Sequence, residues 1–145
     1  MLSTIPYLHF MGNTLEAMNF YKSVFGGEIT VAEKFRNIPG GEKMSVEDQE
    51  KYIHISLVMR NGVTLMATDA LESMGQNLTF GNNFHICMQA ESETEVDQLF
   101  ERLSKGGKVE MPVNKTFFGS YFGMAQDRFG VQWMINYVYP QNKKL

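Results

Sequence analysis

Apolar residues recur at helical spacing in two segments of the chain. They follow the i, i+3, i+4, i+7 pattern of an amphipathic helix, and they are Ala17, Phe20, Tyr21 and Val24 in the first segment and Val96, Leu99, Phe100 and Leu103 in the second. Asn13 or Thr14 can cap the first helix and Ser92 the second, because their side chains accept hydrogen bonds from free backbone N–H groups. The glycine pairs Gly26–Gly27 and Gly106–Gly107 predict where the helices end, since glycine readily adopts the left-handed conformation there.

Segments with the character of strands fill the rest of each half. They are predicted at about 5–11, 28–35, 51–60 and 63–69 in the first half, and at about 83–89, 108–113, 117–126 and 131–138 in the second. A polar stretch at 36–50 contains Pro39-Gly40-Gly41 and is predicted to form a loop or a short helix. Each half therefore has the order strand, helix, strand, strand, strand.

An internal repeat relates the two halves. The run Arg-Asn-Gly-Val-Thr-Leu-Met at 60–66 returns 68 residues later as Arg-Phe-Gly-Val-Gln-Trp-Met, and the two helical apolar sets superimpose when shifted by 79 residues. Such self-similarity indicates a duplicated supersecondary unit. We predict one domain, 1–145, with an α+β fold of two tandem βαβββ modules: module one at about 5–69, a linker at about 70–82 and module two at about 83–138. Each helix covers only one sheet face, so the other module, a second chain or a ligand must cover the opposite face.

Composition and charge narrow the range of partners. The net charge is −3 and no basic stripe is present, so nucleic acid is not expected as a partner. No stretch approaches the roughly 18 to 20 apolar residues that span a membrane, and the first residues lack the pattern of a signal peptide, so no membrane partner is expected. The single cysteine, Cys87, excludes an internal disulfide and fits a reducing, cytoplasmic location.

Several motifs along the chain resemble one known family. They lie at 6–10 (Pro-Tyr-Leu-His-Phe), 17–21 (Ala-Met-Asn-Phe-Tyr) with 25–27, 53–55 (Ile-His-Ile), 65–69 (Leu-Met-Ala-Thr-Asp), 118–123 (Phe-Gly-Ser-Tyr-Phe-Gly) and 127–136. Together they resemble the PhnB-like branch of the vicinal oxygen chelate superfamily, which includes glyoxalases, bleomycin-resistance proteins and dioxygenases. The resemblance implies a curved, mixed or antiparallel sheet with the helices on its convex face. It also implies a homodimer, because related folds complete their cavities by pairing or exchanging modules between chains.

Members of this branch have often been labelled as a methyltransferase of ubiquinone synthesis. No glycine-rich turn follows the first predicted strand in the manner of a nucleotide-binding fold. A doubly wound alternation of strands and helices is also missing. The sequence therefore gives the methyltransferase label no support.

Metal-using members of the superfamily carry four ligand positions, on the first and fourth strands of each module. The resemblance and the internal repeat map these positions onto Pro6, Met66, His85 and Met134. Proline offers no ligand, thioethers suit Cu(I) rather than Zn, Ni, Mn or Fe, and one imidazole cannot hold a divalent ion against water. We therefore predict no metal and no other cofactor. The alternative is a rebuilt site, without paired ligand spacing to support it, that would use His9, His54 or Asp69.

Strand alternation assigns side chains to the two sheet faces. The face away from the helices is predicted to carry His85, Cys87, Gln89, Gln132, Met134, Asn136, Thr64, Met66 and Thr68, and the helix face to carry Phe84, Ile86, Met88, Val131, Trp133 and Ile135. The repeat aligns Pro6 with His85, so alternation places Leu8 and Phe10 on this same face, away from the helices, and His9 on the opposite face. Sparse polar groups among apolar side chains are typical of a small-molecule pocket. We predict that a small-molecule ligand contacts His85, Gln89, Gln132, Met134, Asn136, Met66, Thr64 and Phe10.

Three functions stay open at this point. The first is a small-molecule-binding protein without a metal site, as antibiotic-binding members of the superfamily are. The second is a lyase- or dioxygenase-type enzyme with a rebuilt metal site or an acid–base site around His85, although no nucleophile–base pair is evident and no catalytic residue is assigned. The third is a structural or partner-binding dimer. For His85 and His54, the alternative to a functional role is a structural one. For Cys87, the alternative to a role as a nucleophile is burial as an inert thiol.

Overall fold

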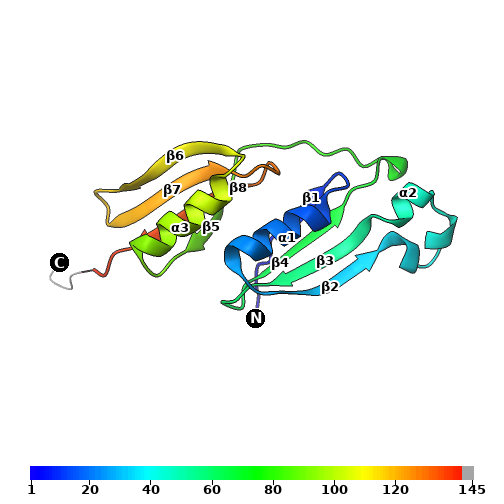
Figure 1. Cartoon of the computed structure of the whole chain (residues 1–145), viewed down its shortest axis with the longest axis horizontal. Helices are drawn as coiled ribbons and strands as arrows, with labels where there is room; N and C mark the ends of the chain where they lie inside the picture. The colour runs from blue at the N-terminus through cyan, green and yellow to red at the C-terminus, as the bar shows by residue number, and fades with distance from the viewer. Residues whose placement is uncertain (142–145) are drawn as a thin grey trace. The chain divides into compact units, whose positions relative to one another are not determined.

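The computed structural model describes residues 1–141 of the chain. The chain divides into two compact units, unit one at residues 1–79 and unit two from residue 80 onward. Each unit has its own four-stranded sheet and the order βαβββ (Figure 1). This order confirms the predicted α+β fold of two βαβββ modules. Within the described residues, every helix is too short or too polar to cross a membrane.

Unit one contains four strands and one long helix. Its elements are β1 (Tyr7–Phe10), α1 (Thr14–Phe25), β2 (Glu28–Lys34), η1 (Phe35–Asn37), η2 (Gly41–Lys43), α2 (Val46–Gln49), β3 (Tyr52–Val58), β4 (Thr64–Asp69) and η3 (Glu72–Met74). The strand order is β1-β4-β3-β2, with β1 parallel to β4 and the other pairs antiparallel. The polar segment between β2 and β3 thus forms two 3-10 turns and a single α-helical turn, which agrees with the loop or short helix expected there.

Unit two repeats this plan without the insertion. Its elements are β5 (Ile86–Gln89), α3 (Glu93–Ser104), β6 (Lys108–Lys115), β7 (Ser120–Gln126) and β8 (Gln132–Val138). The strand order is β5-β8-β7-β6, again with one parallel pair, β5 with β8, and antiparallel pairs elsewhere. Both sheets are therefore mixed. The first strand of unit two begins at Ile86, later than the predicted start at residue 83.

The apolar core of each unit lies between its helix and its sheet. In unit one it comprises Ala17, Met18 and Tyr21 of α1 with Ile55, Leu57, Leu65 and Ala67 of β3 and β4. In unit two it comprises Val96, Phe100 and Leu103 of α3 with Ala125, Trp133 and Ile135 of β7 and β8. The predicted helix-facing positions of β8 are confirmed, since Trp133 is 1% exposed and Ile135 is fully buried.

The two helices begin in different ways. Ser92 caps α3 as predicted, because its hydroxyl accepts a hydrogen bond from the backbone N–H of Glu95 at 3.1 Å. The Asn13 side chain makes no such cap on α1. Instead the Asp69 carboxylate accepts the backbone N–H groups of Thr14, Gly12 and Tyr52, which ties the start of α1 to strands β4 and β3. Helix α1 ends at Gly26 as expected, with φ of 76°. Helix α3 ends earlier, at Ser104 with Lys105 as its C-cap, and Gly106 follows with φ of 78°.

Candidate functional site

The open face of unit two is the sheet face turned away from α3. A Cβ atom at Gly123 would collide with the Phe100 ring of α3, which places the odd-numbered residues of β7 on the helix side. Strand alternation then puts the even-numbered residues of β7 on the open face. Paired residues of neighbouring strands point to the same side, so the register extends this assignment to β8, β5 and β6.

Three rows of side chains cross this open face. By register they are Gln132, Gln126 and Lys108 in the first row, Cys87, Met134, Met124 and Met111 in the second, and Gln89, Asn136, Phe122 and Asn114 in the third. His85 directly precedes β5, and alternation places it at the end of the first row. The middle row is composed of sulfur-containing side chains, and amide side chains lie on both sides of it. Sequence reasoning missed Met124 and Met111, because the alternation of β7 is obscured by glycine and aromatic residues and β6 contains register shifts.

Two amides on this face are buried without complete hydrogen bonding. Gln132 and Asn136 are each 6% exposed. The Asn136 amide nitrogen donates to the Gln89 side-chain oxygen at 3.1 Å, but within residues 1–141 neither Asn136 Oδ1 nor Gln132 Nε2 has a hydrogen-bond partner. A buried polar atom left unpaired costs about 1–3 kcal/mol. The face therefore presents one free acceptor and one free donor that a bound molecule could satisfy.

His85 lies at the edge of the same face and contacts a carboxylate. Its Nε2 atom is 3.0 Å from Glu110 Oε1, and the two side chains are only 22% and 28% exposed. His85 precedes β5 and Glu110 belongs to β6, which are opposite edges of the sheet. The contact therefore joins the two sides of the sheet across its open face. His85 is paired with a side chain rather than with backbone, unlike the core histidine considered as its alternative role.

Cys87 occupies the middle row and is exposed, not buried as its alternative role assumed. Desolvation raises the pKa of its thiol, which favours the protonated and poorly nucleophilic form at neutral pH. Gln89 Nε2 lies 3.8 Å from its sulfur, a weak contact. The thiol therefore has the character of a lining group rather than of a nucleophile.

In unit one the open face carries Tyr7 and His9, and the predicted lining by Pro6, Leu8 and Phe10 is wrong. Tyr7 pairs with Met66 and His9 with Thr68, whereas Phe10 is 1% exposed in the core on the helix side. The predicted orientation of His9, away from this face, is wrong for the same reason.

A difference of one residue between the two units explains the error. Tyr7 of β1 and Cys87 of β5 are equivalent in register, because they pair with the equivalent residues Met66 and Met134. The first strands therefore superimpose with a shift of 80 residues, whereas α1 and α3 superimpose with a shift of 79. A shift of one residue along a strand moves every side chain to the opposite face.

The open face of unit one is rich in hydroxyl and imidazole groups. One row across it is Tyr7, Met66, Ser56 and Val31, and the next is His9, Thr68, His54 and Glu33. His54 links the two rows, since its Nδ1 is 3.2 Å from the Tyr7 hydroxyl and its Nε2 is 2.8 Å from the Ser56 hydroxyl. Ser56 is 5% exposed, so this imidazole–hydroxyl pair is largely shielded from water. Reasoning from sequence spacing did not find this hydrogen-bonded chain, because Tyr7 was assigned to the other face.

The predicted ligand-binding residues thus fall into three places. The open face of unit two holds His85, Gln89, Gln132, Met134 and Asn136, and that of unit one holds Thr64 and Met66. Phe10 lies in the helix-side core of unit one and is not available to a ligand on the open face.

Metal-binding potential is limited in the part of the chain that is described. Residues 1–141 contain no group of three or more His, Cys, Asp or Glu side chains placed to hold a metal ion. Asp69, one member of the alternative rebuilt site, already accepts backbone N–H groups on the helix side. The donors on the open face of unit two are mostly amides and thioethers, which do not form the nitrogen and oxygen set that Zn, Ni, Mn or Fe prefers.

The fold defines the class of protein. Two solved structures described as glyoxalase/bleomycin-resistance/dioxygenase proteins, from Burkholderia phytofirmans PsJN and Frankia sp. EAN1pec, match 92% and 98% of this chain and 96% and 94% of their own. Their TM-scores are 0.63 and 0.68, and their sequence identities are 17% and 14%. At such low identity these structures show the shared fold only. Protein PA1353 from Pseudomonas aeruginosa is more similar: its crystal structure has a TM-score of 0.83 and 33% identity, over 97% of this chain and 100% of that one.

Sequence comparison specifies the family. Residues 3–136 match the family model described as 3-demethylubiquinone-9 3-methyltransferase, and the chain belongs to this family. Protein YjdN of Escherichia coli K12 is 30% identical over 143 residues, which is 94% of this chain and 95% of that protein. The PhnB protein from Bacillus cereus has a TM-score of 0.76 and 28% identity, over 94% of this chain and 100% of that one. The chain is thus a member of the PhnB-like branch, as its motifs suggested.

Proposed function

We propose that this protein binds a small molecule on the open face of the sheet in unit two. We also propose that it does so without a superfamily-type metal ion. The observation that carries the proposal is the pair of unsatisfied amide atoms, Gln132 Nε2 and Asn136 Oδ1, buried on the open face of unit two. A stable sheet would normally pair or replace such groups. Their retention is typical of a surface that is completed by a ligand.

The spacing of these groups suggests the chemistry of the ligand. Gln132 and Asn136 are four residues apart on β8, so their backbones are roughly 13 Å apart. Met134 lies between them, beside Met124 and Cys87. The complementary ligand carries an acceptor at one end for Gln132, a donor at the other for Asn136, and an apolar middle section. Methionine adapts to irregular apolar shapes, which suits this middle section.

Native mass spectrometry of the purified full chain, combined with elemental analysis, tests this function. We expect a co-purifying organic molecule, or its recovery from a metabolite extract, with less than stoichiometric Zn, Ni, Mn or Fe. Gln132→Met keeps the side-chain volume but removes the free donor, and should lower ligand occupancy. Gln98→Met, the same substitution at an exposed position of α3, is the matched control. About one metal ion per chain that is lost on His85→Ala would contradict the metal-free proposal.

A second candidate function is acid–base catalysis, the basis of the lyase-type alternative. The contact between His85 and Glu110 favours it, because a carboxylate can orient an imidazole for proton transfer. In such an enzyme Glu110→Gln would lower kcat far more than KM. If a ligand identified by mass spectrometry is recovered unchanged after prolonged incubation, binding rather than catalysis is the function.

We also propose that the protein forms a homodimer in the cytoplasm. The outer strand β6 leaves Val109 and Met111 exposed by 46% and 37%, and an uncovered apolar sheet edge favours pairing with another chain. The single unpaired thiol fits a reducing compartment. Sedimentation of the full chain should give twice 16.6 kDa at tens of micromolar, and a mass of 16.6 kDa would exclude a stable dimer.

A further inference from the structure

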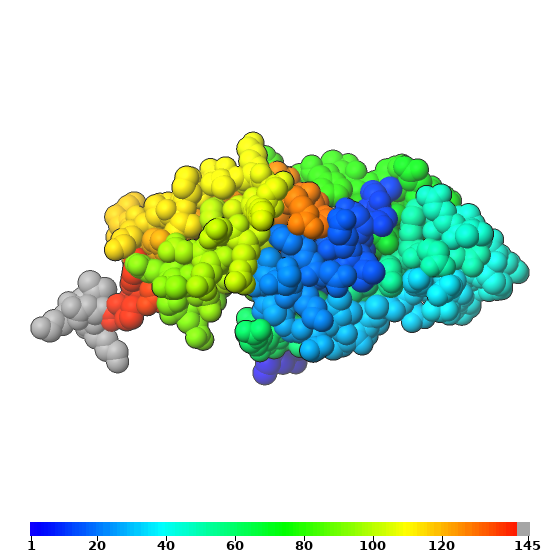
Figure 2. Space-filling model, viewed as in Figure 1, coloured from blue at the N-terminus to red at the C-terminus, as the bar shows by residue number. Residues whose placement is uncertain are grey.

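Unit one contains a cavity that is separate from its open face. The cavity has a volume of about 500 Å³ and lies beside the segment between β2 and β3. Its sheet wall is Ile53, which shares its side of β3 with the core residues Ile55 and Leu57. The cavity therefore opens on the helix side of the sheet, opposite to Ser56 and His54. Figure 2 shows the segment that encloses it, coloured cyan, at the surface of the molecule.

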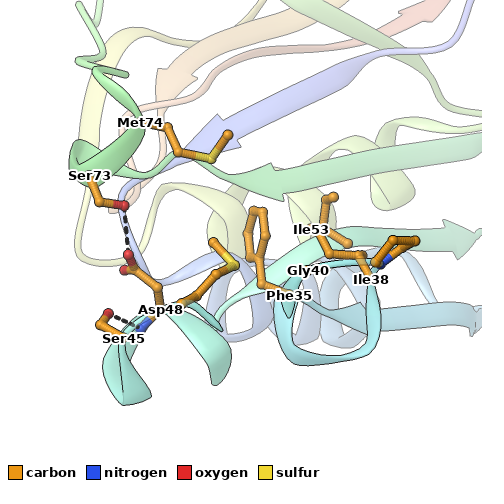
Figure 3. Close-up of a pocket in the computed structure, with 10 residues that line it drawn as sticks. Phe35, Ile38, Gly40, Ser45, Asp48, Ile53, Ser73 and Met74 are labelled. Atoms are coloured by element: carbon orange, nitrogen blue, oxygen red, sulfur yellow. Dashed lines mark hydrogen bonds between the residues drawn. The ribbon is translucent and has the colours of Figure 1, made fainter. Parts of the chain in front are cut away.

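The walls of this cavity are mainly apolar. Phe35, Ile38, Met44, Ile53 and Met74 contribute most of the lining. In Figure 3 the Phe35 ring stands beside Ile53, and Met74 extends from η3 on the other side of the cavity. The pocket is open to solvent on one side, with Met74 exposed at its edge. Its volume lies within the range of roughly 300–1,000 Å³ that is typical of small-molecule sites.

Asp48 supplies the polar end of the cavity and is 8% exposed. Its Oδ2 accepts a hydrogen bond from the Ser73 hydroxyl at 2.6 Å, and its Oδ1 accepts one from Lys51 Nζ at 3.2 Å. The backbone N–H of Asp48 also donates to the Ser45 hydroxyl (Figure 3). These bonds fasten η3 to α2 and keep the two walls of the cavity in place. The hydrogen bonds from Ser73 and Lys51 lower the pKa of Asp48, so its carboxylate stays ionised at neutral pH.

An ionised carboxylate can accept about four hydrogen bonds in total. Ser73 and Lys51 occupy two of these positions on Asp48. We infer that this cavity binds a compact apolar molecule that carries one hydrogen-bond donor, with the apolar body between Phe35, Ile53 and Met74 and the donor directed to Asp48. Lys51 already compensates the charge of Asp48, so a neutral hydroxyl is sufficient as the donor. This site does not depend on the proposed function of the open faces.

Methyl spectra of the full chain, with ¹³C-labelled methionine methyl groups, test the inference directly. The probe is 2-phenylethanol, which has an apolar body and one hydroxyl, and ethylbenzene is its partner without the donor. We expect 2-phenylethanol to shift the methyl signals of Met44 and Met74 in a saturable manner. The signals of Met124 and Met134 on the open face of unit two should not move. Shifts confined to Met124 and Met134, or no shift up to the solubility of the probe, would overturn the cavity site.

Variants distinguish the two parts of the site. Met74 is 63% exposed at the edge of the cavity, so Met74→Trp should leave folding intact, fill the entrance and reduce probe affinity at least tenfold. Val46→Trp is the matched control, because Val46 is 81% exposed and lies outside the cavity lining. Asp48→Asn should weaken 2-phenylethanol about fivefold or more and leave ethylbenzene unchanged. Equal binding of 2-phenylethanol to wild type and Met74→Trp would refute the proposal even if Asp48→Asn fails to fold.

Discussion

The open faces of the two units share a backbone plan but differ in chemistry. The row that holds Cys87, Met134, Met124 and Met111 in unit two is occupied in unit one by Tyr7, Met66, Ser56 and Val31. Of these positions, only the one on the last strand keeps the same residue, Met66 and Met134. Unit one satisfies its polar groups internally, since His54 bonds both Tyr7 and Ser56. Unit two leaves Gln132 and Asn136 incompletely bonded. Duplication thus preserved the scaffold, while on the open faces of residues 1–141 the buried polar atoms without a partner lie in unit two.

The largest expected effect concerns the helix side of unit two. Trp133→Ala should lower the free energy of unfolding by about 3–5 kcal/mol, because it opens a cavity under α3. It also removes the Trp133 Nε1 donor, 2.8 Å from the Asp127 carboxylate, which is itself buried and bonded to the turn that follows it. Urea denaturation measures the change, and Trp133→Phe is the control that keeps most of the volume. A wild-type midpoint for Trp133→Ala would show that the two faces of β8 have been assigned the wrong way round.

The next effect has the opposite sign and tests the central contrast between the open faces. Gln132→Met should raise the free energy of unfolding by up to about 1–3 kcal/mol, because it removes a buried amide donor that lacks a partner. The equivalent change in unit one, Thr64→Val, should alter stability by less than about 0.5 kcal/mol, since Thr64 is half-exposed. Thermal and urea denaturation of both variants make the comparison. A loss of stability in Gln132→Met would mean that this amide supports the fold.

A smaller effect is expected at His85. His85→Ala should change the free energy of unfolding by no more than about 1 kcal/mol, because the pair with Glu110 is partly solvated and lies at the edge of the sheet. Its effect should instead be seen in ligand binding, measured by the occupancy in native mass spectra. Glu110→Gln keeps the size of the partner and serves as the control. A large fall in the melting temperature of His85→Ala would show that this histidine has a structural role instead.

The smallest effect at neutral pH concerns Tyr121 and Tyr139, whose hydroxyl groups are hydrogen-bonded to carboxylates of α3. Hydrogen bonding to Asp97 raises the pKa of Tyr121 to about 12, and burial together with the Glu93 carboxylate raises that of Tyr139 to about 12. Their unfolded pKa is about 10, so the stabilisation is complete below pH 10 and is lost as the pH rises from 10 to 12. The midpoint of urea denaturation should fall over this range. Tyr121→Phe should make the fall shallower, and an unchanged slope would exclude the contribution of Tyr121.

The helices and the repeated fold follow from local sequence patterns. The apolar spacing in 17–24 and 96–103 marks the buried sides of α1 and α3, and the repeated run at 60–66 and 128–134 marks the turn into β4 and β8. These features depend on neighbours within one or two turns of the chain, which is why the sequence alone determines them. The face assignment of β8 was correct for the same reason, since Gln132 and Trp133 alternate along one strand.

Tertiary structure alone decided which side chains come together. Sequence alternation could not place Tyr7 beside His54, because the register of β1 against β4 depends on a one-residue difference between the units. It could not pair His85 with Glu110, which are 25 residues apart in the sequence and lie at opposite edges of the sheet. The cavity beside Asp48 depends on η3 folding against α2, a contact between residues 25 positions apart. Local sequence determined the elements and their buried sides, whereas pairing register and long-range contacts determined the chemistry of the sites.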